Sequence, residues 1–203
     1  MSSKRKAQGK RKPSPERRGT SKQGGQPPRR ESQLPASEIR RSPARLSVRK
    51  LPDEDAWELV HPRCVLDRVE DLDEVRAMLD AGEVDVARDE CRWLLDGCPD
   101  CLEAHRILGE IALGDDDLPL ARGHFGHAYR QANSATQQAG SGAVFPYRLP
   151  ANQALFEAAK GLVWCLKQLD KPQMAAEVIA RVVALDPNDP LGIRGILDQG
   201  SSP

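Results

Sequence analysis

A repeated order of small and apolar residues is the feature that most restricts how this chain can fold. Ala87 is followed by Cys91 and Leu94, and Ala121, 34 residues later, stands in the same frame before Phe125. A third copy of the frame consists of Ala175, Ile179, Val182, Val183 and Pro187. A period of roughly thirty to forty residues is typical of stacked helical hairpins, each burying its apolar face against its neighbours. The spacing therefore predicts an all-α chain of about three hairpins.

Apolar spacing and turn residues set the expected bounds of these hairpins. Apolar residues recur three and four positions apart, and Gly82, Pro99 and Asp170 mark breaks between helices. Asn152, shortly after Pro150, is expected to cap the first helix of the third hairpin. The expected division is an arm at 1–50, an N-terminal cap at 51–67, repeats at about 68–101, 102–135 and 153–189, a loop insertion at about 136–152 and a C-terminal cap at 190–198. The N-terminal cap is predicted as a short turn or helix over the open end of the first repeat.

Several residues of the second and third repeats stand in an order used by a known repeat family. They are Leu108, Gly109, Ala121, Phe125, Ala128 and the Asp186–Asn188 ending. On these residues the chain resembles the tetratricopeptide repeat family, over about residues 68–189 with one interruption. The resemblance implies a right-handed solenoid of helical hairpins, in which small residues allow close helix packing and a large apolar residue fills the gap. The first repeat departs from the pattern, with Cys91 where a large residue is expected.

The resemblance also implies a surface for partners. In that family the first helices of the hairpins line a groove that holds an extended peptide or a helix, so we expect a protein–protein interaction scaffold without a cofactor. The expected partner-facing residues are Arg76, Leu79, Glu103, Arg106, Glu110, Lys160, Trp164 and Lys167. The basic members of this set can pair with an acidic or carboxylate-ended peptide. Trp164 is either a binding hot spot or a packing residue against the C-terminal cap.

The insertion between the second and third repeats ends in an apolar and aromatic stretch. Phe145, Tyr147 and Arg148 stand within it, and the chain has only eight aromatic residues in all. One interpretation is that these side chains pack on a neighbouring hairpin and seal the gap. The other is that they form a loop that contacts a partner, since aromatic residues and arginine are common interface anchors.

The net charge of zero hides an opposition between the two parts of the chain. Residues 1–50 hold 16 basic and 3 acidic residues, a net +13, and residues 51–203 hold 14 and 27, a net −13. The first part is poor in apolar residues and predicts disorder through about residue 50. Its densest cluster comprises Lys4, Arg5, Lys6, Lys10, Arg11 and Lys12. Such an arm can bind nucleic acid without sequence preference, fold back on the acidic domain, or act only as a solubilising tail.

The sequence offers little for catalysis. No nucleotide-binding glycine motif, nucleophile elbow or catalytic triad is visible, so we do not expect an enzyme. Cys98 and Cys101 have the spacing of zinc ligands, and His61 and Cys64 could complete a set of four, but an ordinary turn between hairpins is the favoured interpretation. Five cysteines without a secretion signal predict reduced thiols. The pair His124 and His127 is predicted to be solvated.

The same sequence features set the expected compartment. There is no run of about eighteen apolar residues, and the charged N-terminus is not followed by an apolar stretch. We therefore expect neither a membrane span nor a secretory signal, and a cytoplasmic protein whose basic cluster could serve as a nuclear address in a eukaryote. Three repeats are near the minimum for a stable stack, so weak self-association through an open end is a further expectation.

Overall fold

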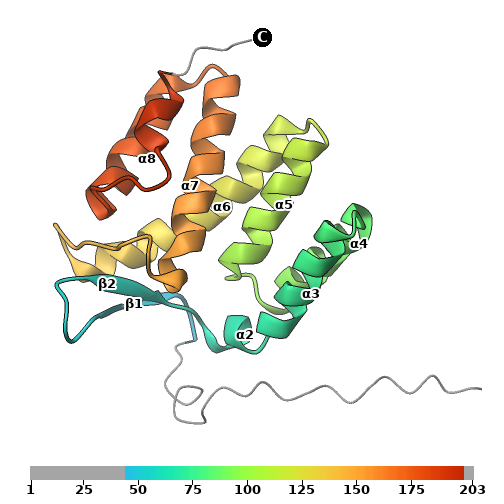
Figure 1. The fold of residues 1–203 in the computed structure, drawn as a ribbon, viewed down its shortest axis with the longest axis horizontal. Coiled ribbons are helices and arrows are strands. Elements are labelled where there is room, and N and C mark those ends of the chain that lie inside the picture. Colours follow the sequence, from blue (N-terminus) through green and yellow to red (C-terminus); the bar gives the residue numbers. More distant parts are fainter. Residues whose placement is uncertain (1–43, 199–203) are drawn as a thin grey trace, which may run out of the picture. The chain divides into compact units, whose positions relative to one another are not determined.

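The computed structural model of this chain describes residues 44–198 (Figure 1). These residues all belong to one compact unit. The basic cluster between Lys4 and Lys12 lies outside the described residues. Within residues 44–198, no helix is both long and apolar enough to cross a membrane.

The described chain is mostly helical, which confirms the expected helical character, but two strands that were not expected precede the helices. Its helices are α2 (Arg63–Leu66), α3 (Val69–Asp80), α4 (Val84–Gly97), α5 (Leu102–Gly114), α6 (Leu118–Thr136), α7 (Pro150–Gln168) and α8 (Pro172–Leu185), with short 3-10 helices η1 (Gln137–Ala139) and η2 (Ile193–Ile196). Two strands, β1 (Ser47–Lys50) and β2 (Trp57–Val60), precede them. The six long helices form three consecutive hairpins, α3/α4, α5/α6 and α7/α8, and each hairpin packs against the next in chain order.

The turns inside the three hairpins have the same structure. The first helices end at Asp80, Gly114 and Gln168, and three residues separate each from its second helix. The middle turn residue is left-handed in every case: Gly82 has φ 78°, Asp116 has φ 59° and Asp170 has φ 54°. The backbone N–H of the third turn residue then donates to a carbonyl in the last turn of the first helix, at 2.8 to 2.9 Å. Glycine adopts this backbone freely and aspartate more readily than most residues, which explains why these residue types occupy the turns.

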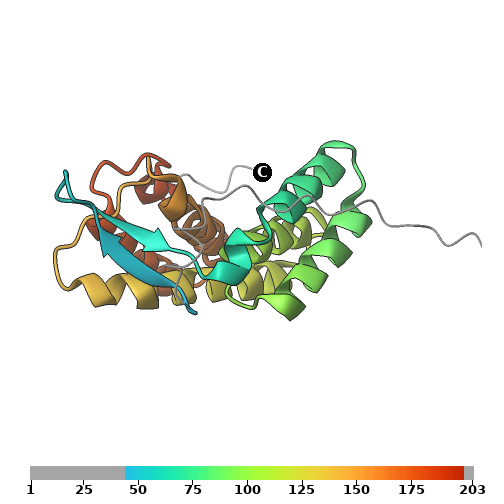
Figure 2. The same ribbon diagram turned by 90° about the horizontal axis from the view of Figure 1, so that it is seen from below.

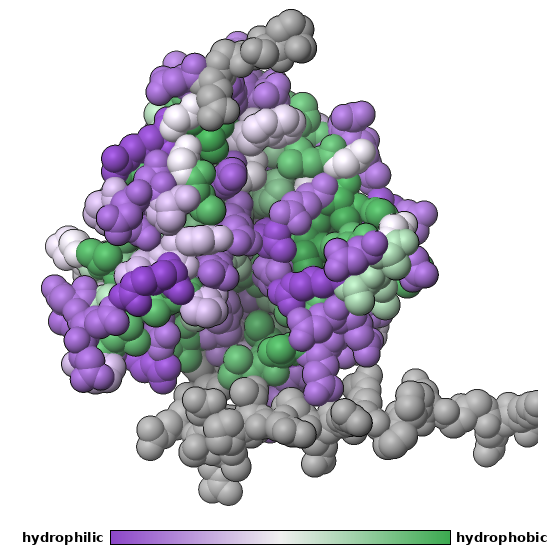
Figure 3. All heavy atoms as spheres, viewed as in Figure 1, coloured by the Kyte–Doolittle hydropathy of each residue, from purple (hydrophilic) through white to green (hydrophobic). Residues whose placement is uncertain are grey.

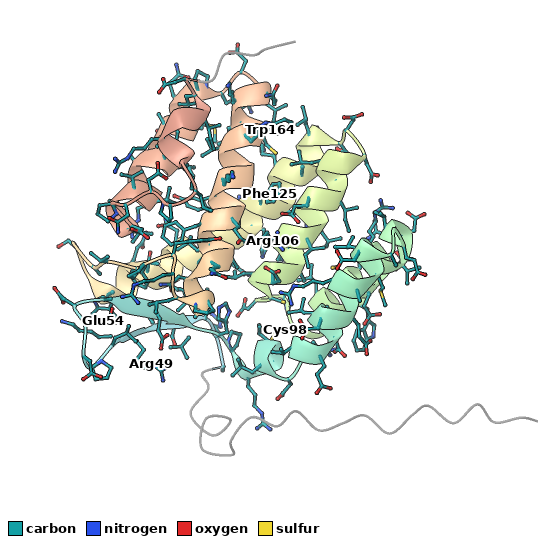
Figure 4. All side chains as sticks on the ribbon, viewed as in Figure 1. Arg49, Glu54, Cys98, Arg106, Phe125 and Trp164 are labelled. Atoms are coloured by element: carbon teal, nitrogen blue, oxygen red, sulfur yellow. A yellow bond between two sulfur atoms is a disulfide. The ribbon has the colours of Figure 1, made fainter. Side chains whose placement is uncertain are left out.

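Phe125 fills the gap between the second and third hairpins, as its place in the repeat suggested. Its ring is almost fully buried on α6. A Cβ atom added to Gly109 on α5 would lie 2.7 Å from the ring, and one added to Gly161 on α7 would lie 2.6 Å from it. Both distances are shorter than a carbon–carbon contact allows. Two glycines from different hairpins therefore make room for one aromatic ring (Figure 4).

The buried apolar residues form two clusters that meet along α5. The larger cluster joins the strands with α6, α7, α8 and η2. The smaller one joins α2, α3, α4 and one side of α5, through residues such as Val75, Leu94 and Ile107. The first hairpin thus packs on one side of α5 through a small cluster, whereas α6 and the third hairpin share the larger one.

The segment before the first hairpin differs from the prediction. Leu46 is buried, and β1, formed by residues within the stretch expected to be disordered, pairs with β2 in an antiparallel hairpin. The boundary of the predicted disorder at residue 50 is therefore wrong. Leu59 belongs to the larger core with α6 and α7, so β2 does not cap the first repeat. Only α2, through Val65, packs on the core of the first hairpin. The alternation in these four-residue strands is too short for periodicity to identify them.

The third hairpin also begins differently from the prediction. Helix α7 starts at Pro150, a residue favoured in the first helical turn because it lacks the N–H that would be unpaired there. Asn152 therefore lies inside the helix instead of capping it. Its buried side chain accepts from Leu59 N–H at 2.9 Å and donates to the carbonyls of Trp57 at 3.1 Å and Pro146 at 3.0 Å. One amide thus joins β2, the insertion and α7.

The chain after α8 folds back on the third hairpin. Ile193 and Ile196 of η2 are buried against α7 and α8, within the segment 190–198 that the sequence predicted as a C-terminal cap. Asp189, itself left-handed with φ 45°, accepts from Ile193 N–H at 2.8 Å. The third hairpin is therefore covered at this end by η2.

Candidate protein-interaction face

The first helices of the three hairpins lie side by side and form one face. In Figure 1, α7, α5 and α3 follow one another from left to right, and Figure 2 shows the same helices from below. We call their shared surface the first-helix face. It is defined by Asp73, Arg76, Leu79, Glu103, Arg106, Glu110, Leu113, Glu157, Lys160, Trp164 and Lys167. This set includes all eight residues that the sequence predicted to meet a partner.

Ion pairs connect the three helices across this face. Arg76 on α3 contacts Asp73 at 2.6 Å and reaches Glu103 on α5 at 2.9 Å. Arg106 on α5 contacts Glu103 at 2.8 Å, pairs with Glu110, and lies 3.2 Å from Glu157 on α7. Arg106 therefore stands at the centre of a network that spans all three hairpins (Figure 4).

The network favours the ionised forms of Glu103 and Arg106. Burial opposes ionisation of Glu103, but the bonds from Arg106 and Arg76 outweigh it and lower the pKa of Glu103 below its ordinary value. Burial likewise opposes charge on Arg106, yet Glu103 and Glu110 raise its pKa. Glu110 responds in the opposite sense, because burial is its largest influence and raises its pKa. The two arginines are thus already neutralised by carboxylates of the same face, and an acidic peptide would have to compete for them.

The remaining face residues differ in how far they reach solvent. Leu79 and Leu113 are half-buried, and Lys160 is exposed. Trp164 is 42% exposed, which is high for a tryptophan in a folded core. Lys167 donates to the carbonyl of Ile196 in η2 at 2.8 Å. The face therefore has Trp164 towards one end and Arg106, with its ion-pair network, towards the other (Figure 4).

The aromatic insertion is built into the fold. Phe145 is fully buried and its ring lies 6.5 Å from that of Trp57 in β2, so it is not available to a partner in this structure. Tyr147 is half-buried and donates from its hydroxyl to Glu157 at 2.9 Å. Arg148 is exposed and pairs with Glu54 in the β1–β2 turn. Of the three predicted loop contacts, only Tyr147 borders the first-helix face, through Glu157.

The structure corrects the prediction of reduced thiols. Cys98 forms a disulfide with Cys64, which links α2 to the end of α4, and Cys91, Cys101 and Cys165 are free and buried. Burial raises the pKa of Cys91 to about 12 and that of Cys101 above its ordinary value, so neither is a reactive thiolate at neutral pH. In the part of the chain that the structure describes, no group of three or more His, Cys, Asp or Glu side chains is arranged to hold a metal ion. Because its sulfur is in the disulfide, Cys98 has no thiolate to offer a metal ion in this structure.

Sequence reasoning missed a cluster of histidines between α5 and α6. The Nδ1 atoms of His105 and His124 lie 3.3 Å apart, and the rings of His105 and His127 have centroids 4.2 Å apart. The i, i+3 spacing of His124 and His127 was visible in the sequence, but their partner His105 comes from another helix. These side chains are partly buried instead of fully solvated as predicted.

Exposed apolar side chains also recur at one position of the second helices. Val86, Leu120 and Met174 are each the third residue of α4, α6 and α8, and they are 52%, 45% and 50% exposed. Figure 3 shows hydrophobic residues reaching the surface among hydrophilic ones on the face viewed in Figure 1. The three residues provide matched controls for substitutions on the first-helix face.

Comparison with protein-family models, with curated proteins and with solved structures found no match for this chain.

Proposed function

We propose that residues 44–198 form a protein-interaction module of tetratricopeptide-like hairpins, which binds a peptide or helix of a partner protein on the first-helix face. The observation that carries the proposal is the continuity of this face. Ion pairs join α3 to α5 and α5 to α7, and Trp164 stands 42% exposed on the same surface. A large, exposed aromatic residue on the same surface as arginine side chains matches the composition of binding hot spots.

The repeated turns support the solenoid part of the proposal. In each hairpin three residues separate the first helix from the second. The middle one of the three, Gly82, Asp116 or Asp170, has a left-handed conformation. In stacked repeats of this kind each hairpin contacts its neighbours and the first helices line one surface. The same surface is where the resemblance to the tetratricopeptide family expects a ligand.

The test is capture of partners from the native cell by the full chain and by two variants of matched exposure. Trp164→Ala removes the exposed indole of the face, and Met174→Ala removes an equally exposed side chain from α8. We expect partners that Met174→Ala retains and Trp164→Ala loses, with affinity reduced about thirtyfold for a hot spot. A set of partners unchanged by Trp164→Ala and by Glu110→Lys would contradict binding on this face.

A second candidate function rests on the charge of the N-terminal segment. Residues 1–50 carry a net +13, enough for salt-dependent association with nucleic acid while the hairpins recruit proteins. Replacing Lys4, Arg5, Lys6, Lys10, Arg11 and Lys12 by Gln in the full chain separates the two functions. Loss of nuclease-sensitive partners alone would support the second function, and retention of every partner would contradict it.

A further inference from the structure

The side chain of Gln131 contacts the turn that connects the first hairpin to the second. Its amide nitrogen lies 3.1 Å from Asp100 Oδ1, 3.3 Å from the carbonyl of Pro99 and 2.8 Å from His127 Nε2. Pro99 and Asp100 belong to the turn between α4 and α5, whereas Gln131 and His127 lie on α6. This side chain therefore ties the turn to the second hairpin.

The tie requires an unprotonated His127 nitrogen. An amide NH₂ group only donates, so His127 Nε2 must accept and cannot carry a proton. The amide orientation is fixed, because the reverse orientation would place Gln131 Oε1 against the Asp100 carboxylate and the Pro99 carbonyl. In the observed orientation Gln131 Oε1 is buried without a hydrogen-bond partner. A buried, unsatisfied acceptor of this kind carries a free-energy cost.

The other two histidines face the same restriction. His105 Nδ1 and His124 Nδ1 are 3.3 Å apart, so one must donate and the other accept. Full protonation would put two donors against each other. His105 also stacks on His127. The three rings therefore pack well only while most of them are neutral.

We propose that His127, Gln131 and the His105–His124 pair form an acid-sensitive latch, which ties the Cys98–Cys101 turn to α6 when the rings are neutral and releases it when they take up protons. Protonated His127 becomes a donor at Nε2, and the adjacent acceptor is the orphaned Gln131 Oε1. Turning the amide to present this oxygen removes the donor from Pro99 and Asp100. Gln131 Oε1 therefore accepts from protonated His127 in the released state, whereas it has no partner in the latched state.

Burial and the charged groups around the cluster together determine how the pKa values of the three histidines shift. Burial is the largest influence on all three rings and lowers each pKa, that of His105 to about 4. Arg92 on α4 acts in the same direction on His124, and Arg130 on α6 does so on His127. Asp100 and the Pro99 carbonyl oppose these effects on His127 and His105. Arg88 and Asp115 also border His124, but they pair with each other at 2.7 Å.

The sign of the pH dependence follows from these shifts. The latched state has lower histidine pKa values than the released state, where they approach 6.5. The released state therefore binds more protons between about pH 6.5 and 4, and the latch weakens as the pH falls through this window. The population of the released state should rise about tenfold per pH unit for each proton taken up.

The test is amide hydrogen exchange of the full chain between pH 7.5 and 4.5, corrected for intrinsic exchange rates. We expect protection of the Cys98–Cys101 turn and the start of α5 to fall with pH, while that of α8 changes little. His127→Phe keeps a ring in the stack but cannot take up a proton, so its turn should lose most of the pH dependence, the remainder coming from the His105–His124 pair. Gln131→Met removes the tie and should leave the turn weakly protected even at pH 7.5. His61→Gln is the control, because His61 lies outside the cluster and hydrogen-bonds to the Ala151 carbonyl.

Each outcome decides the proposal. Loss of most of the pH dependence in His127→Phe together with its retention in His61→Gln supports the latch. Protection that rises at acid pH would mean that Asp100 captures the protonated ring and would overturn it. Persistence of the pH dependence in Gln131→Met would also overturn it, and this variant decides the question if His127→Phe does not fold.

Discussion

The first and third hairpins have the same turn but are attached to the rest of the molecule in different ways. Helix α7 buries ten residues, and the third hairpin shares its core with α6, the strands and η2. Helix α3 buries only Leu72 and Val75, and the core of its hairpin is separate. The first hairpin packs on α5 alone through this smaller cluster, and particular contacts, such as the Cys64–Cys98 disulfide and the Arg76–Glu103 ion pair, add to that attachment.

This difference predicts that the two hairpins respond differently to substitution. A hairpin held by continuous apolar packing loses stability when volume is removed, and it unfolds with the rest of the core. A hairpin held by discrete ties can open locally when one of them is broken. Exposed apolar residues on the first hairpin, including Val69, Val86 and Trp93, are consistent with its smaller core. Four substitutions test this comparison, from the largest expected effect to the smallest.

Removing the ring of Phe125 should give the largest loss. Phe125→Ala leaves a cavity between α6 and α7 and should lower the free energy of unfolding by about 3–5 kcal/mol, measured by denaturant titration. Leu120→Ala on the same helix is the control, because Leu120 is 45% exposed and should change stability little. Gly161→Ala should be harmful in the natural chain but better tolerated beside Phe125→Ala, since the added methyl group meets this ring. Equal penalties in both backgrounds would show that the two residues do not pack as described.

Breaking the disulfide should open the first hairpin alone. Cys64→Ser removes a link between residues 34 apart in sequence and should reduce the local stability of α2 to α4 by about 2–4 kcal/mol. Hydrogen exchange should therefore accelerate in α3 and α4 and remain slow in α7. Cys98→Ser or a reductant should have the same effect, and adding the reductant to either variant should change nothing more. Faster exchange throughout the domain would mean that the two hairpins are not independent.

The hairpins were predictable from sequence because their signals are local. Gly82, Asp116 and Asp170 interrupt apolar stretches of the right spacing, and the face residues follow from their positions on the first helices. The disulfide and the histidine cluster were missed because each joins residues on different elements, and no local pattern encodes such a pairing. The strands were missed because four residues are too few for periodicity, and β2 is tied to α7 only through Leu59 and Asn152, 93 positions apart.

The same distant pairing can be tested at Asn152. Asn152→Ala removes three hydrogen bonds and leaves buried groups of Leu59, Trp57 and Pro146 without this partner. We expect a loss of about 1–3 kcal/mol in the free energy of unfolding, with faster exchange in β2 and at the start of α7. Asn152→Asp keeps the acceptor for Leu59 N–H but loses both donated bonds, so it should not restore stability. A neutral effect of Asn152→Ala would mean that water replaces the side chain.

The smallest effect is expected for the ion pair that joins the first hairpin to the second. Arg76 is 48% exposed as a side chain, and pairs of this kind contribute about 0–1 kcal/mol because solvent screens them. Arg76→Met should therefore reduce the local stability of α3 slightly, and the loss should shrink in high salt. A double-mutant cycle with Glu103→Gln isolates the pair, and Arg92→Met, whose partner Asp89 is on the same helix and exposed, is the control. If the coupling exceeds about 2 kcal/mol or ignores salt, the two hairpins are joined here by more than a screened ion pair, and the contrast with the third hairpin weakens accordingly.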